Sequence, residues 1–115
     1  MRCERLNVWK RSGRLSVEVY KAFGSSQDYG FKDQITRSSL SIASNIAEGV
    51  EQESDKDKAR FINIAQGSSA ELITQIYIGI EIAYIEKITG MAWIKKINEI
   101  LRMLNALRKS YAQRP

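Results

Sequence analysis

Apolar residues recur at helical spacing along most of the chain. Near the start, one stripe consists of Val8, Leu15, Val19 and Ala22. It lies beside a heptad stripe of Leu6, Trp9, Gly13, Ser16, Tyr20 and Phe23. Near the end, another heptad stripe runs from Ile94 to Tyr111. Together these patterns predict four helices, over residues 5–23, 31–48, 55–84 and 90–111.

Turn-forming residues separate the predicted helices. The clearest loop covers residues 24–30, with a glycine at each end. We expect Gly49 to end the second helix in the left-handed conformation, Ser54 or Asp55 to cap the third helix, and Thr89 to cap the fourth. Four helices with three short connections predict one all-α domain over residues 1–115, an up-down-up-down four-helix bundle.

One segment of the third predicted helix is ambiguous. Ile76, Ile78, Ile80 and Ile82 alternate with other residues, which taken alone is typical of a strand. A helical interpretation instead places Leu72, Ile76 and Ile80 on one stripe. We favour the helix because the segment continues a helical pattern without a break.

Composition indicates a soluble globular protein, with 43% hydrophobic and 27% charged residues. Cys3 is the single cysteine, so no disulfide forms within the chain. No signal peptide is visible, because charges occur throughout residues 1–20, and the most apolar segment, residues 72–85, is too short to span a bilayer. We therefore expect a cytoplasmic location and no membrane partner.

The net charge of +5 is unevenly distributed. Residues 1–21 carry six Lys/Arg against two acids, residues 87–115 carry seven against one, and residues 22–86 carry five against ten. Because the first and fourth helices are neighbours in such a bundle, their cations are expected to form one broad basic face. The candidate phosphate contacts on it are Lys10, Arg11, Arg14, Lys95, Lys96, Arg102, Arg108 and Lys109.

Two tryptophans lie near these cations and admit two interpretations. Trp9 and Trp93 could stack on unpaired bases. We favour a core or interface position for both, because they lie in register with the apolar stripes. The cations themselves are interpreted as a weak polyanion surface, with ordinary solvated charges as the alternative.

Polar residues form a second pattern, on the second and third predicted helices. If that antiparallel pair turns near residue 53, Arg37 lies roughly opposite Glu71, which predicts a polar network between the helices. The alternative is a catalytic carboxylate pair, Glu48 with Glu71, but the two would be about 15 Å or more apart along the helices. The predicted network comprises Gln34, Arg37, Ser41, Asn45, Glu48, Glu71 and Gln75.

Other catalytic or metal chemistry has little support in the sequence. The chain has no histidine, which removes the commonest general base and metal ligand. No phosphate-binding glycine loop occurs, and the acidic turn of residues 51–57 lacks the central glycine of a calcium loop. We therefore expect no enzyme activity, no cofactor and no metal site, with a weak cation site at the acidic turn as an outside alternative.

The polar stripe also carries a family resemblance. The pattern Phe31-x-x-Gln34-x-x-Arg37-x-x-x-Ser41-Ile42-x-x-Asn45-Ile46-Ala47-Glu48-Gly49, followed by Phe61 and Ala65-x-Gly67-Ser68-x-x-Glu71-Leu72-x-x-Gln75, resembles the four helix bundle protein family. Its members include S23-type proteins encoded in intervening sequences of bacterial 23S rRNA genes. The family is related to the accessory protein of diversity-generating retroelements, a basic homopentamer that works with a reverse transcriptase and its RNA.

The resemblance implies a left-handed four-helix bundle that forms a homopentamer and has no known catalytic activity. Two positions depart from the family pattern, since no proline precedes the second helix and acidic Val50-Glu51-Gln52 follows Gly49. Apolar surface beyond one face per helix independently predicts self-association. We therefore expect a non-catalytic homo-oligomeric accessory protein that binds structured RNA or DNA through the first and fourth helices. The alternative is a scaffold that docks an acidic protein partner.

Overall fold

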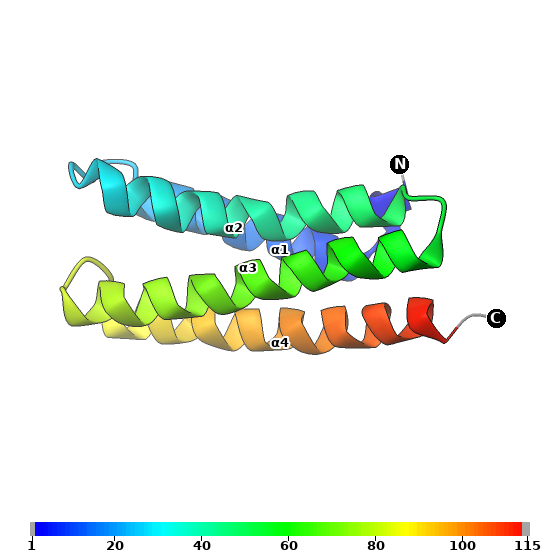
Figure 1. The fold of residues 1–115 in the computed structure, drawn as a ribbon. Coiled ribbons are helices and arrows are strands. Elements are labelled where there is room, and N and C mark those ends of the chain that lie inside the picture. The colour runs from blue at the N-terminus through cyan, green and yellow to red at the C-terminus, as the bar shows by residue number, and fades with distance from the viewer. Residues whose placement is uncertain (1, 114–115) are drawn as a thin grey trace.

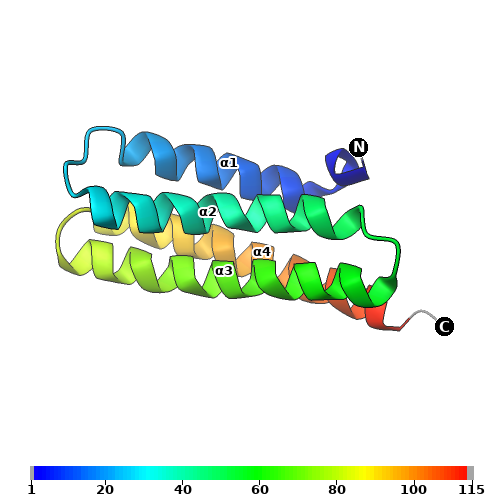
Figure 2. The ribbon, with the colours of Figure 1, turned by 45° about the horizontal axis from the view of Figure 1, so that its top comes forward.

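The computed structural model describes residues 2–113, apart from the side chain of Glu4. A short 3-10 helix, η1 (Arg2–Arg5), precedes four α-helices. These are α1 (Asn7–Ala22), α2 (Tyr29–Val50), α3 (Asp55–Glu81) and α4 (Lys87–Ala112). Each helix runs antiparallel to the next, and α4 returns beside α1 (Figures 1 and 2). This confirms the predicted all-α four-helix bundle, a rod of 49 × 21 × 21 Å.

The core follows the predicted stripes with two corrections. On α1, Val8, Leu15 and Val19 are buried, whereas Ala22 of the same stripe and Tyr20 of the heptad stripe are exposed. Isoleucines and leucines from α2, α3 and α4 complete the core. The buried Ser16 and Ser39 hydroxyls lie 3.1 Å apart, so α1 and α2 also share a hydrogen bond inside the bundle.

The ends of the helices differ from the predicted ends for identifiable reasons. Asp28 caps α2, since its side chain accepts from the backbone N–H of Phe31, so the helix begins two residues early. Ser54 caps α3 as predicted, by accepting from the N–H of Asp57. Thr89 caps nothing, because α4 begins at Lys87 after an extended Glu86.

The alternating isoleucine segment is helical. α3 continues through Ile80 and ends at Glu81, three residues before its predicted end. Ala83 then takes a positive φ of 63°, which turns the chain toward α4. The β-branched residues lie in a helix because burial of Leu72, Ile76 and Gly79 against the bundle outweighs local strand propensity.

The prediction for Gly49 was wrong. Gly49 lies inside α2, which continues to Val50, and no described glycine has a positive φ. Its role is to allow close approach of α3, because a Cβ built there would lie 2.9 Å from the Cβ of Phe61 and 3.3 Å from the carbonyl oxygen of Lys58. The absence of a side chain, and not backbone freedom, is what this position requires.

Candidate nucleic-acid interface

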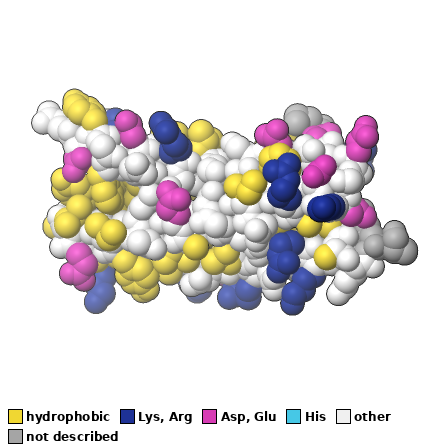
Figure 3. Space-filling view, in the orientation of Figure 1, with side chains coloured by type: hydrophobic (Ala, Val, Ile, Leu, Met, Phe, Trp, Pro, Cys, Tyr) yellow, Lys and Arg dark blue, Asp and Glu magenta, His cyan; other side chains and the backbone are white. Residues whose placement is uncertain are grey.

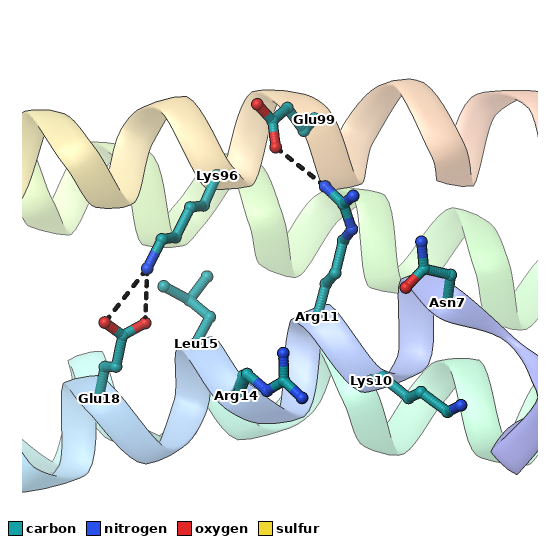
Figure 4. A pocket seen from close by; sticks show the side chains of 8 residues that line it. All are labelled: Asn7, Lys10, Arg11, Arg14, Leu15, Glu18, Lys96 and Glu99. Carbon is teal, nitrogen blue, oxygen red and sulfur yellow. Dashed lines mark hydrogen bonds and ion pairs between the residues drawn. The ribbon is translucent and has the colours of Figure 1, made fainter.

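A groove of about 370 Å³ lies between α1 and α4. Its basic residues Lys10, Arg11 and Arg14 come from α1, one helical turn or less apart, and Lys96 faces them from α4 (Figure 4). Leu15 contributes an apolar wall. The structure thus brings four of the eight predicted cations together, as expected for neighbouring helices.

Two of these four cations are engaged in ion pairs across the groove. Arg11 donates to Glu99 at 3.0 Å, and the Lys96 ammonium lies 2.9 and 3.2 Å from the two carboxylate oxygens of Glu18 (Figure 4). All four side chains are well exposed, so each pair stabilises the fold by about 1 kcal/mol or less. The pairs nevertheless neutralise Arg11 and Lys96 locally, whereas Lys10 and Arg14 have no acidic partner among the described residues.

The remaining cations of α4 do not face this groove. Lys95, Arg102 and Lys109 follow one another at seven-residue intervals, so they form one exposed stripe on the side of α4 away from α1. None of the three pairs with an acid within residues 2–113. The single broad face expected from the sequence is therefore two separate basic strips on adjoining sides of the rod.

Arg108 joins neither strip. Its guanidinium donates to the Gln66 side-chain oxygen of α3 at 3.1 Å and to Asn105 at 3.0 Å. The side chain is half-buried. Arg108 thus links α4 to α3, and its role as a phosphate contact stays a prediction.

The tryptophans lie where the core interpretation placed them. Trp93 is only 3% exposed and belongs to the core, and Trp9 is half-buried against it. Trp93 therefore offers no open ring face to a nucleobase, whereas Trp9 keeps part of its surface accessible.

The polar stripe forms a smaller network than predicted. The Ser41 and Ser68 hydroxyls lie 2.9 Å apart, Ser38 donates to Glu71 at 2.9 Å, and Asn45 donates to Ser41. Gln75 donates to Glu71 at 3.3 Å, and its own side-chain oxygen is buried without a partner. These bonds confirm the predicted antiparallel register of α2 and α3.

Three predicted members lie outside this network. Gln34, Arg37 and Glu48 are exposed, and their side chains form no hydrogen bond with another described residue. Arg37 does line a groove of about 180 Å³ with Ser38 and Glu71, so its predicted level along the bundle is right. Ser38 and Ser68 form the hydrogen bonds between the helices that were expected of the longer side chains. The short serine side chains let the two helices approach closely enough for these bonds.

A family model of 23S rRNA-intervening sequence proteins matches residues 4–106. The chain belongs to the 23S rRNA-intervening sequence protein family. A crystal structure of a protein of unknown function from the S23 ribosomal protein family of Bacteroides thetaiotaomicron is similar to it, with 25% identity and a TM-score of 0.83. That similarity covers 89% of this chain and 98% of the other. No curated protein matches the chain.

Carboxylates are dispersed in this 23S rRNA-intervening sequence protein. Glu71 pairs with Ser38, and Glu48 lies ten residues further along α2, about 15 Å away along the helix axis. Within residues 2–113 no three side chains of the metal-binding types gather into a candidate site. In the acidic turn, Asp57 lies 3.6 Å from Arg60, and Ser54 caps α3.

Over the described part of this family member, no helix is both long enough and apolar enough to be a candidate membrane span.

Proposed function

We propose that this protein is a non-catalytic, homo-oligomeric accessory protein that binds structured RNA or other nucleic acid through the unpaired cations of α1 and α4. The observation that carries the proposal is that five of the eight predicted phosphate contacts are exposed and have no acidic partner among the described residues. These are Lys10, Arg14, Lys95, Arg102 and Lys109.

Unpaired cations are the ones that gain most from a phosphate. A lysine already paired with a carboxylate must give up that pair to bind a nucleic acid, whereas Lys95 or Arg102 gives up only water. The two strips adjoin along a straight rod, so an extended polyanion can contact both at once. A nucleic-acid role also agrees with the cytoplasmic location expected from the sequence.

Self-association is the second part of the proposal. An apolar groove of about 300 Å³ between α1 and α2 is lined by residues that include the exposed Val17, Tyr20 and Leu40. A second apolar area, the turn patch of Ile78, Ile82 and Ile88, surrounds the α3–α4 connection (Figure 3). Ile88 is 85% exposed, and such areas are usually covered by another protein surface. We assign both to contacts between copies of this chain, which would multiply weak phosphate contacts.

The test is a fluorescence-anisotropy titration of a labelled structured RNA at 50 and 200 mM salt, with duplex DNA as competitor. Five phosphate contacts on a duplex would give a slope of about −4.5 in log affinity against log salt. We expect Lys95→Gln, Arg102→Gln and Lys109→Gln together to flatten that slope and weaken binding strongly.

The matched control is a variant with Arg37→Gln, Lys56→Gln and Arg60→Gln, which removes the same charge from α2 and α3. Equal losses in the two variants would mean that net charge alone drives binding. If the wild-type protein binds neither nucleic acid at 50 mM salt, the proposal fails. The alternative, a scaffold for an acidic protein, would then be the better description of the basic strips.

A further inference from the structure

A depression of about 350 Å³ lies between α3 and α4, on the side of α4 away from α1. Tyr77 borders it from α3, and Ile94, Lys95, Asn98 and Arg102 border it from α4. Its volume falls at the lower end of the range of pockets that hold small ligands, about 300–1,000 Å³. It shares Glu99 with the α1–α4 groove, so the two sites adjoin across α4.

Tyr77 supplies an accessible aromatic ring at this depression. The side chain is 48% exposed, and its ring and hydroxyl contact no other described residue through a ring stack or hydrogen bond. Tyr84, by contrast, donates its hydroxyl to Asp28 and packs on Phe31. Because aromatic faces stack on unpaired bases, Tyr77 provides what the buried Trp93 cannot.

Two cations flank the same depression. Lys95 and Arg102 are seven residues apart, about 10.5 Å along α4, and both are exposed. The one carboxylate in the lining, Glu99, accepts from Arg11 at 3.0 Å on the other side of the helix. Its charge is thus compensated, and the depression presents two free cations to an incoming phosphate chain.

Asn98 lies between the two cations on the same helix face. It is exposed and makes no side-chain hydrogen bond with another described residue. A carboxamide both donates and accepts, which suits the polar edge of a nucleobase. Ring, carboxamide and flanking cations thus come together within one depression.

We infer that this α3–α4 depression binds one unpaired nucleotide of a nucleic acid chain. Tyr77 stacks on the base, Asn98 bonds to its edge, and Lys95 and Arg102 hold the phosphates on either side. The inference rests on the proposed nucleic-acid role and narrows it to molecules with loops, bulges or single-stranded segments. A continuous duplex would use the cations but leave Tyr77 idle.

The test compares a hairpin RNA carrying an unpaired loop with a blunt RNA duplex of the same stem, by fluorescence anisotropy at about 150 mM salt. Tyr77→Ala should weaken hairpin binding about tenfold, as expected for the loss of one base stack, and change duplex binding less than twofold. Tyr77→Phe keeps the ring and should bind like wild type. Tyr29→Ala is the matched control, an exposed tyrosine at the start of α2 that lines neither the depression nor the α1–α2 groove.

A DNA hairpin of the same sequence tests whether the depression distinguishes an unpaired ribonucleotide from an unpaired deoxyribonucleotide. Equal sensitivity of RNA and DNA to Tyr77→Ala assigns the site to any unpaired nucleotide, and sensitivity of RNA alone assigns a contact to the 2′-hydroxyl. Equal losses for hairpin and duplex, or no loss for either, would overturn the inference while leaving the proposed function intact. A smaller sedimentation coefficient for Tyr77→Ala would also overturn it, because the depression would then be a contact between copies. Absence of binding to both RNAs, at 50 mM salt as well, would overturn the inference and the proposed function together.

Discussion

Asp28 connects two loops at one end of the bundle. One carboxylate oxygen accepts from the backbone N–H of Phe31 at 3.1 Å, and the other accepts from the Tyr84 hydroxyl at 2.8 Å. The Phe31 N–H first, and the Tyr84 hydroxyl second, hold the pKa of Asp28 below its ordinary value of 3.8. The same carboxylate raises the pKa of Tyr84 above 10.0. Phe31 also packs between Phe23 and Tyr84, so this single aspartate holds the middle residue and one end of an aromatic cluster.

The lowered pKa of Asp28 predicts a loss of stability in acid. A carboxyl whose pKa is lower in the folded state stabilises the fold above its unfolded-state pKa, and this contribution disappears as pH falls through the folded-state pKa. We therefore expect Asp28→Asn, which can still cap α2, to show a smaller drop in urea midpoint between pH 6 and pH 3 than wild type. Asp33→Asn, an exposed aspartate in the same helix, is the control. An unchanged drop in Asp28→Asn would show that this carboxyl contributes nothing to the acid response.

At the scale of the helices, direct contact between α2 and α3 depends on small residues. Ser41, which bonds to Ser68 of α3, and Gly49 both lie on the side of α2 that faces α3, and each lets α3 come close. Longer side chains there would hold the helices apart and expose the isoleucines beneath them. The polar stripe therefore sets the distance between these helices as well as their register.

Substitutions at two glycines distinguish the effect of close helix approach on stability from the effect of intrinsic helix propensity. Gly49→Ala should lower the free energy of unfolding by about 1–3 kcal/mol, because the new methyl group meets the Phe61 Cβ and the α3 backbone. Gly67→Ala should raise it by about 0.5–1 kcal/mol, because a Cβ at Gly67 has nothing within 4 Å and alanine favours the helix. Urea unfolding followed by circular dichroism measures both. Equal effects of the two substitutions would contradict the close-approach role of Gly49.

The helices themselves were predictable, because long apolar stripes with a 3.6-residue period dominate the sequence. The ends were less so. Asp28 starts α2 through its side-chain cap, Glu86 starts α4 without one, and Ala83 takes a left-handed conformation that a sequence would assign to glycine. These choices are made by the packing of the bundle around them.

At the scale of the whole molecule, the sequence predicted which helices carry the cations but not which cations are free. Lys96 and Glu18 are 78 residues apart in the chain, so their ion pair follows only from the packing of α1 on α4. The direction of Arg108 toward Gln66 likewise depends on the rotation of α4. Tyr77 was not among the predicted site residues, because the sequence alone does not show that it is exposed beside Lys95. That position follows from the packing of α3 on α4.

The exposed apolar areas predict the effect of a charge on assembly. Leu40→Glu places a carboxylate in the α1–α2 groove and should lower the sedimentation coefficient at micromolar concentration while leaving helix content unchanged. Ile64→Glu is the control, since Ile64 is exposed on α3 outside both apolar areas. A wild-type protein that sediments as a monomer would contradict the assigned contacts.

The contacts of η1, at the end of the rod away from Asp28, have a consequence for the synthesis of the chain. Arg2 donates to the carbonyl of Val50 and, through its backbone N–H, to Glu51, and Lys58 donates to the same Val50 carbonyl. The next residue, Cys3, also lies in η1, and its side chain is buried. A ribosome adds about 5–20 residues per second, so the first residues emerge several seconds before their partners exist. During that interval the Cys3 thiol is open to solvent and to any chaperone or oxidant, and it is enclosed only when the first half of the bundle has formed.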